Sequence, residues 1–155
     1  MTQREVEILL VEDNPADVEL AVHALRHNNL ANQIAVVRDG EEALDFLFGR
    51  GAFDQRDMEH PPKLVLLDLK LPKLDGLEVL REMRGDPRTR AIPVVILTTS
   101  REESDLVRSY SIGVNSYIQK PLNFDDFRET VRQLGLYWLV VNQVPSGRAF
   151  AETSE

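Results

Sequence analysis

The stretch KLVLLDLKLPKLDG, residues 63–76, constrains the fold of this chain more than any other segment. It places a lone carboxylate, Asp68, within a run of apolar residues, and Pro72 and the turn dipeptide Asp75-Gly76 follow closely. An apolar run of this length, bounded by turn residues, is typical of a strand that is buried on both faces. Such strands belong to parallel sheets, whose ligands bind outside the carboxyl ends of the strands. We therefore predict that Asp68 points into a binding crevice.

Length and composition favour one domain and exclude several classes of protein. At 155 residues with 43% hydrophobic content, the chain is long enough for one cored domain and short for two. No apolar run approaches the ~20 residues that span a bilayer, and the start MTQREVE is unlike a signal peptide, so we expect a cytoplasmic protein without a membrane partner. With no cysteine, only oxygen and imidazole remain as metal ligands. A net charge of −8 without clustered Lys and Arg argues against binding nucleic acid.

Strands and helices are predicted to alternate five times along the chain. The expected strands are residues 6–11, residues 34–37, the strand that carries Asp68, and the segments IPVVILTTS and VNSYIQKP. A helix follows each strand and begins after a capping residue: Asn14, Asp39, Asp75, Ser100 and Asn123. This alternation requires right-handed crossovers and a parallel sheet with helices on both faces. The predicted fold class is therefore α/β, doubly wound.

Two details of this prediction concern the region after the second strand. The inward face of the second helix is expected to consist of Ala43, Leu44, Leu47 and Phe48. The segment from Gly49 to Pro62 has the composition of a polar loop.

Polar side chains follow the predicted strands where these end. Glu12 and Asp13 follow the first strand, Asp68 the third, Thr98 the fourth and Lys120 the fifth. Three carboxylates brought together repel one another, so a hard cation such as Mg²⁺ is expected among them. Because Mg²⁺ takes few protein ligands and favours phosphate oxygens, the site suits a phosphoryl group. Asp68 is then the candidate nucleophile, Lys120 a point charge and Thr98 a hydroxyl donor.

Over residues 5–135 these motifs resemble a response-regulator receiver domain of two-component signalling. The resemblance rests on five motifs in order: Glu12-Asp13, Asp68 with Pro72 and Asp75-Gly76, Thr98, Tyr117 within SYIQKP, and Lys120. It implies a flavodoxin-like fold with five parallel strands in the order 2-1-3-4-5. It also implies that Asp68 accepts a phosphoryl group from a sensor histidine kinase, and that output passes through protein–protein contacts rather than catalysis.

The resemblance assigns a role to each site residue. Asp13 would bind Mg²⁺ directly and Glu12 through water, while Asp68 and the backbone carbonyl of Lys70 would complete the protein ligands. Lys120 would contact the phosphoryl group. Thr98 would move towards that group and Tyr117 would rotate inward, which is the general logic of a phosphorylation switch. Lys70 departs from the usual pattern and borders the site, where it could alter the dephosphorylation rate.

A narrower resemblance is to the single-domain regulators that partner bacterial phytochrome-type histidine kinases. It rests on VEDNPADVEL, on the long connection from Gly49 to Pro62, on TTSREESDLVRSYSIGVNSYIQKP and on YWLVVNQVP. This resemblance implies a phytochrome-type kinase as the phosphoryl donor.

The last predicted helix carries more apolar side chains than one buried face needs. One seam follows helical spacing, and further apolar residues load other faces of the same helix. The seam is Phe127, Val131, Leu134, Trp138 and Val141; the other faces carry Leu136, Tyr137, Leu139 and Val140. We expect a homodimer through the fourth and fifth helices and the fifth strand, or else coverage by the polypeptide past Asn142. The receiver domain is expected to span residues 1–142 with this helix, and residues 143–155 to form a tail.

Three rival functions remain at this point. A phosphatase of the haloacid dehalogenase type also uses a strand-end aspartate, Mg²⁺ and lysine, but it needs a second aspartate where Lys70 stands. A flavodoxin-like flavin carrier is disfavoured because Glu12-Asp13-Asn14 would repel a flavin phosphate. A receiver-like scaffold that is never phosphorylated is the third. His23 and His27 have a metal-chelating spacing, but we expect them to form a solvated helix face.

Overall fold

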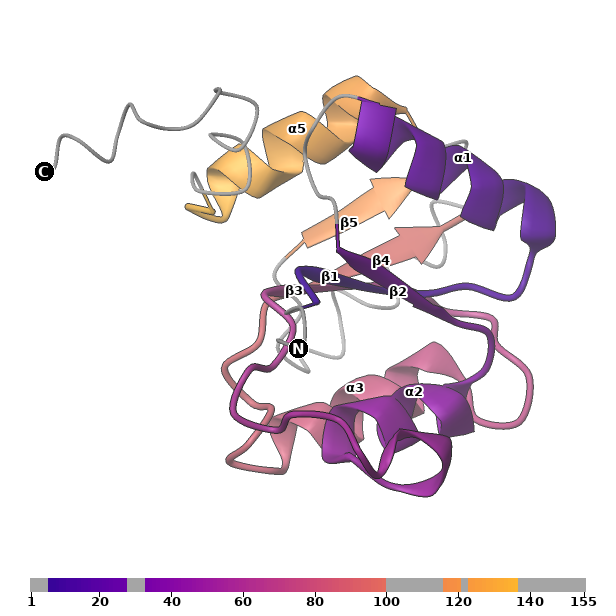
Figure 1. Cartoon of the computed structure of the whole chain (residues 1–155). Coiled ribbons are helices and arrows are strands. Elements are labelled where there is room, and N and C mark those ends of the chain that lie inside the picture. The colour runs from indigo at the N-terminus through magenta and orange to yellow at the C-terminus, as the bar shows by residue number, and fades with distance from the viewer. Residues whose placement is uncertain (1–5, 28–32, 100–115, 121–122, 137–155) are drawn as a thin grey trace, which may run out of the picture.

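The computed structural model describes residues 6–27, 33–99, 116–120 and 123–136. Five strands form one parallel sheet in the order β2-β1-β3-β4-β5, which confirms the predicted doubly wound α/β fold (Figure 1). The strands are β1 (Ile8–Val11), β2 (Ile34–Val37), β3 (Leu64–Asp68), β4 (Val94–Thr98) and β5 (Ser116–Gln119). The helices are α1 (Pro15–His27), α2 (Gly40–Phe48), α3 (Gly76–Arg84), α5 (Phe124–Gln133) and the 3₁₀ turn η1 (Gly51–Phe53). The helix predicted from Ser100 lies outside the described residues.

Helices cover both faces of the sheet. α1 and α5 lie on one side of the strands and α2 and α3 on the other (Figure 1). Successive residues of β3 point to opposite faces, so Val65 and Leu67 join the core under α2 and α3, while Leu66 joins the core under α1 and α5. Because β1, β3 and β4 lie inside the sheet and are covered on both faces, every one of their residues is buried.

Four of the five capping residues predicted from the sequence lie within the described residues, and each begins a helix. Side-chain oxygens of Asp39, Asp75 and Asn123 accept hydrogen bonds from backbone N–H groups three residues ahead, at 2.7, 3.0 and 2.9 Å. Asn14 Oδ1 accepts from the N–H of Ala16 at 2.9 Å, just beyond the carboxyl end of β1. These bonds satisfy N–H groups that the first helical turn leaves without a partner.

The prediction for the inward face of α2 missed one residue. Phe46 is buried at 4% exposure, whereas the predicted Phe48 is half-buried and packs against the same core. The reason lies in the following connection, which contains η1 and brings the ring of Phe53 within 5.1 Å of the Phe46 ring. The Arg56 guanidinium lies 4.4 Å from the same ring. A segment with the composition of a loop thus extends the core beyond the sheet.

The predicted continuous helix through Trp138 and Val141 was also wrong, because α5 ends at Gln133. Gly135 takes a left-handed conformation with φ of 78°, and its N–H donates to the Arg132 carbonyl at 3.0 Å. The N–H of Leu136 donates to the Val131 carbonyl at 3.1 Å, which completes a Schellman cap. Residues from Tyr137 onward, including the rest of the predicted apolar seam, lie outside the described residues.

No helix within the described residues has the length and apolar character that a membrane span requires.

Candidate functional site

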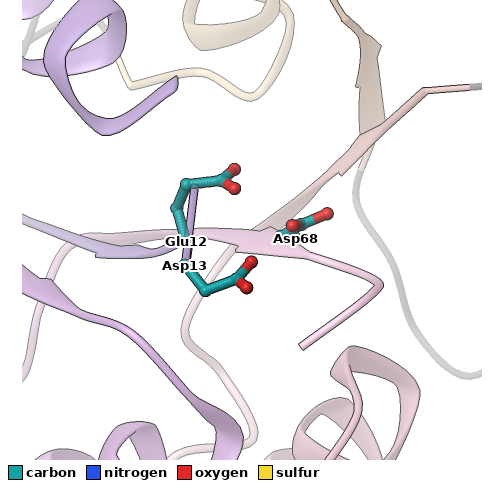
Figure 2. Close-up of side chains that lie close together, drawn as sticks. All are labelled: Glu12, Asp13 and Asp68. Atoms are coloured by element: carbon teal, nitrogen blue, oxygen red, sulfur yellow. The ribbon is translucent and has the colours of Figure 1, made fainter. Parts of the chain in front are cut away.

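Three carboxylates meet at the carboxyl edge of the sheet (Figure 2). Asp68 is the last residue of β3, and Glu12 and Asp13 directly follow β1, which pairs with β3. One oxygen from each of the three side chains lies within 4.8 Å of the others. Glu12 and Asp68 are buried, whereas Asp13 is exposed. The parallel register of two neighbouring strands is what brings together residues that are more than fifty positions apart in sequence.

The turn after β3 shapes the backbone around Asp68. The N–H of Gly76 donates to the Leu69 carbonyl at 2.9 Å, so α3 begins directly against the strand end. A Cβ atom on Gly76 would overlap the carbonyl oxygen of Asp68, so only glycine allows this close approach. The backbone N–H of Lys70 donates to the Asp68 carboxylate, while the Lys70 side chain is exposed.

Lys120 supplies the positive charge at this edge. Its Nζ lies 2.9 Å from Glu12 Oε1, 2.9 Å from Asp17 Oδ2 and 3.6 Å from Asp68 Oδ2. The backbone N–H of Lys120 donates to the Thr98 carbonyl at 2.7 Å, which holds the lysine beside the end of β4. The ammonium therefore lies among three carboxylates, closer to Glu12 and Asp17 than to Asp68.

The pKa values at the site reflect burial and crowding. Burial raises the pKa of Glu12 to about 7; the close contact and charge of Lys120 oppose this shift, and the Asp68 charge adds to it. Burial likewise raises the pKa of Asp68 above its ordinary value, against the opposing charge of Lys120. For Lys120, burial lowers the pKa, but Asp17, Glu12 and Asp68 outweigh it and the pKa is raised overall. The ammonium thus stays charged, while the two buried carboxyl groups retain their protons to a higher pH than they would in water.

The donor set fits a divalent metal ion. Glu12 is fully buried, and within the described part of the chain its Oε1 atom accepts no hydrogen bond despite its short contact with Lys120. Its other oxygen accepts from the N–H of Asn14 at 3.2 Å. A buried carboxylate oxygen without a hydrogen-bond donor is unfavourable, and a cation beside three carboxylates would relieve this. The site therefore offers the all-oxygen ligands that Mg²⁺ and Mn²⁺ prefer.

The other residues predicted for the site border it. Thr98 is fully buried as the last residue of β4, one position beyond the partner of Asp68 in the ladder. Tyr117 lies on β5 opposite Ile96 and packs against the core under α2 and α3. The predicted site residues thus cluster at the carboxyl edge of the sheet, except for Tyr117. Tyr117 lies within β5, three residues before Lys120. His23 and His27 lie elsewhere, exposed on α1 with their rings stacked at 5.1 Å.

Sequence reasoning missed Asp17. This residue is in the first turn of α1, and its carboxylate accepts a hydrogen bond from Lys120 Nζ. Its position three residues after the cap Asn14 could have indicated that it faces the strand ends, but nothing local links it to a lysine 103 positions away.

Comparisons with known proteins match most of the chain. The family model of the response regulator receiver domain matches residues 8–132. The chain is 46% identical over 138 residues to the probable methanogenesis regulatory protein FilR2 of Methanothrix harundinacea, covering 89% of this chain and 86% of that protein. It is 40% identical over 139 residues to the response regulator Rcp1 of Synechocystis sp., covering 90% and 92%.

Solved structures agree with these matches. The bacteriophytochrome response regulator RtBRR has a TM-score of 0.83 and 49% identity, covering 96% of this chain and 89% of that chain. The Mn(2+)-bound form of Rcp1 has a TM-score of 0.70 and 40% identity, covering 88% and 95%.

Proposed function

Because this chain belongs to the response regulator receiver family, we propose that Asp68 accepts a phosphoryl group from a sensor histidine kinase in a Mg²⁺-dependent reaction. Members of this family bind a divalent metal at an acidic pocket and act in two-component signalling. The observation that carries the proposal is the convergence of Glu12, Asp13 and Asp68 within 4.8 Å, beside the ammonium of Lys120.

Each site residue has a separate role in the proposed phosphoryl transfer. A carboxylate oxygen of Asp68 attacks the phosphorus atom, the aspartyl O–P bond forms, and the bond from phosphorus to the donor breaks in line. Glu12, Asp13, Asp68 and the carbonyl of Lys70 would hold Mg²⁺, which supplies positive charge that neutralises the phosphoryl oxygens. Lys120 offers a further positive charge 3.6 Å from the attacking carboxylate.

Thr98 and Tyr117 are the proposed switch. The phosphoryl oxygens draw the Thr98 hydroxyl towards Asp68, and Tyr117 moves inward behind it. This change alters the surface of β5 and α5, which are in contact at one edge of the sheet. We propose that output passes through binding at this surface, including homodimerisation, rather than through catalysis of a further reaction.

The kinase we propose is phytochrome-type. The 49% identity to a bacteriophytochrome response regulator, over 96% of this chain, supports this donor. The test is phosphotransfer from a purified phytochrome-type kinase, compared with an unrelated histidine kinase at the same concentration. Equal transfer from both kinases would contradict the proposed donor while leaving the phosphoacceptor role intact.

Intact-protein mass spectrometry tests the phosphoacceptor. The wild-type chain is incubated with a small phosphodonor and Mg²⁺, alongside Asp68→Asn and a chelator control. Asp54→Asn is the matched control, because it makes the same substitution at an exposed position after η1. We expect one phosphoryl group on wild type and on Asp54→Asn, and none on Asp68→Asn or with the chelator. A gain on Asp68→Asn would place the acceptor elsewhere, and no gain on wild type would favour the scaffold.

A phosphatase of the haloacid dehalogenase type fits the geometry less well. Such an enzyme needs an acid and base two residues after the nucleophile, and Lys70 occupies that position with an exposed side chain.

A further inference from the structure

Lys120 is bound more closely to a residue outside the family site than to the proposed phosphoacceptor. Its Nζ donates a hydrogen bond to Asp17 Oδ2 at 2.9 Å, while Asp68 Oδ2 lies 3.6 Å away. The Lys120 side chain is only 10% exposed and that of Asp17 21% exposed, so water screens this pair weakly. The ammonium is therefore as close to Asp17 on α1 as to Glu12, and closer to both than to Asp68.

The position of Asp17 is set by the start of α1. Asn14 Oδ1 accepts hydrogen bonds from the N–H groups of Ala16 and Asp17, at 2.9 and 3.2 Å. A carboxylate in the first turn is also stabilised by the positive end of the helix dipole. Asp17 is thus a fixed negative charge on the helical side of the ammonium.

The other two contacts of the ammonium are both proposed metal ligands. Lys120 Nζ is 2.9 Å from Glu12 Oε1 and 3.6 Å from Asp68 Oδ2. Without Asp17, the lysine would be drawn fully onto these carboxylates, where its charge would compete with a cation. With Asp17 in place, the ammonium is shared between Asp17 and Glu12, each at 2.9 Å, and stays 3.6 Å from Asp68.

We propose that Asp17 is a positioning residue, which shares the Lys120 ammonium with Glu12 and so limits how strongly this charge competes with a metal ion at Glu12 and Asp68. This inference rests on the proposed function, because it assumes that the carboxylates bind a divalent cation. It assigns to Asp17 an effect on metal affinity that is transmitted through Lys120. A carboxylate that only stabilises the helix N-terminus would affect folding stability but not metal affinity.

Mn²⁺ titration followed by electron paramagnetic resonance, without any phosphodonor, tests the proposal. We expect Asp17→Asn to weaken Mn²⁺ binding roughly threefold to tenfold, because it removes one charge and releases another towards the ligands. The matched control is Glu19→Gln, which makes the same change of charge on the exposed surface of α1. We expect this control to change the affinity by less than about twofold, because solvent and salt screen it.

A double-mutant cycle with Lys120→Met tests whether Asp17 affects metal binding through Lys120 or independently of it. If Asp17 acts through the lysine, Asp17→Asn in the Lys120→Met background should change Mn²⁺ affinity by less than about twofold. Asp17→Glu, which retains the charge, should restore most of the affinity lost in Asp17→Asn. Circular dichroism on every variant shows whether α1 and the fold are intact.

The outcomes distinguish this inference from the proposed function. One outcome would be that wild type binds Mn²⁺, that Asp13→Asn weakens this binding, and that Asp17→Asn and Glu19→Gln have the same Mn²⁺ affinity. Asp17 would then have no positioning role, and the proposed metal site would stand. An equal loss from Asp17→Asn with and without Lys120 would likewise overturn the role. If wild type binds no Mn²⁺, the proposed metal site fails first, and this inference fails with it.

Discussion

Two positions on β3 show opposite relations to their surroundings. Leu66 and Asp68 are two residues apart, so their side chains point to the same face of the sheet, and both are buried. Leu66 packs among apolar side chains under α1 and α5. Asp68 faces two further carboxylates, and burial raises its pKa. The apolar side chain of Leu66 thus matches its apolar surroundings. The carboxylate of Asp68 instead needs positive charge from outside β3, which is typical of a functional site.

The largest effect is expected in the interior. Leu66→Ala should lower the free energy of unfolding by about 2–5 kcal/mol, because it removes buried methyl groups and leaves a cavity. Urea denaturation measures this value. The matched control is Leu20→Ala on α1, where the side chain is 50% exposed and a loss below about 1 kcal/mol is expected. Equal losses at the two leucines would show that the interior of β3 is not the tightly packed region described above.

The second effect concerns metal and pH at the strand end. In the metal-free protein the pKa of Glu12 is raised from 4.5 to about 7, so between these values the folded state retains a proton that the unfolded state has released. The free energy of unfolding should therefore fall as pH rises from 4.5 to about 7, and Glu12 should contribute no further change above that.

A metal ion that binds Glu12 must displace the proton from this carboxyl group. The stabilisation by the metal ion should therefore grow as pH rises to about 7 and then level off. At a hundredfold excess over Kd, the metal should contribute about 2.7 kcal/mol. Calorimetric unfolding with Mg²⁺ and with a chelator, from about pH 5 to about pH 8, measures the difference. Glu12→Gln should remove most of this pH dependence. A difference in Tm that is constant with pH would contradict the assignment to Glu12.

The third effect concerns the glycine that lets α3 approach the strand end. Gly76→Ala should lower the free energy of unfolding by about 1–3 kcal/mol, because its Cβ would overlap the Asp68 carbonyl. It should also slow phosphorylation by a small phosphodonor, because the backbone that carries Asp68 must shift. Gly135→Ala is the control, since a Cβ there meets no atom within 4 Å and the loss is conformational, about 1 kcal/mol. Phosphorylation unchanged in both variants would show that the close approach does not shape the site.

The smallest expected effect is a gain in the free energy of unfolding rather than a loss. Asp68→Asn should raise the free energy of unfolding of the metal-free protein above pH 7 by about 1 kcal/mol, because it removes a buried charge beside two others. Urea denaturation in the presence of a chelator measures this gain. Asp54→Asn, at an exposed position after η1, should leave stability within about 0.5 kcal/mol. A loss of stability in Asp68→Asn would mean that Lys120 fully compensates the carboxylates.

Several features could be predicted because their signals are local. The capping residues Asp39, Asp75 and Asn123 accept the predicted hydrogen bonds. Strands with continuous apolar runs form the buried parallel sheet, and their polar end residues meet at one edge. Gly135 is a helix-stop residue two positions after the end of α5, whereas the apolar spacing continues past it, so the predicted helix was too long.

The amino-acid sequence by itself determined the order of elements and the chemistry of the strand ends, because helix caps, turns and apolar runs act over a few residues. The tertiary structure alone decided which charges meet. It placed Asp17 against Lys120 and left one oxygen of Glu12 without a hydrogen bond among the described residues. It also buried Phe46 more fully than Phe48, although both side chains pack with the same core. Such pairings depend on the distance between side chains from separate elements, which sheet register and helix packing set only once the chain has folded.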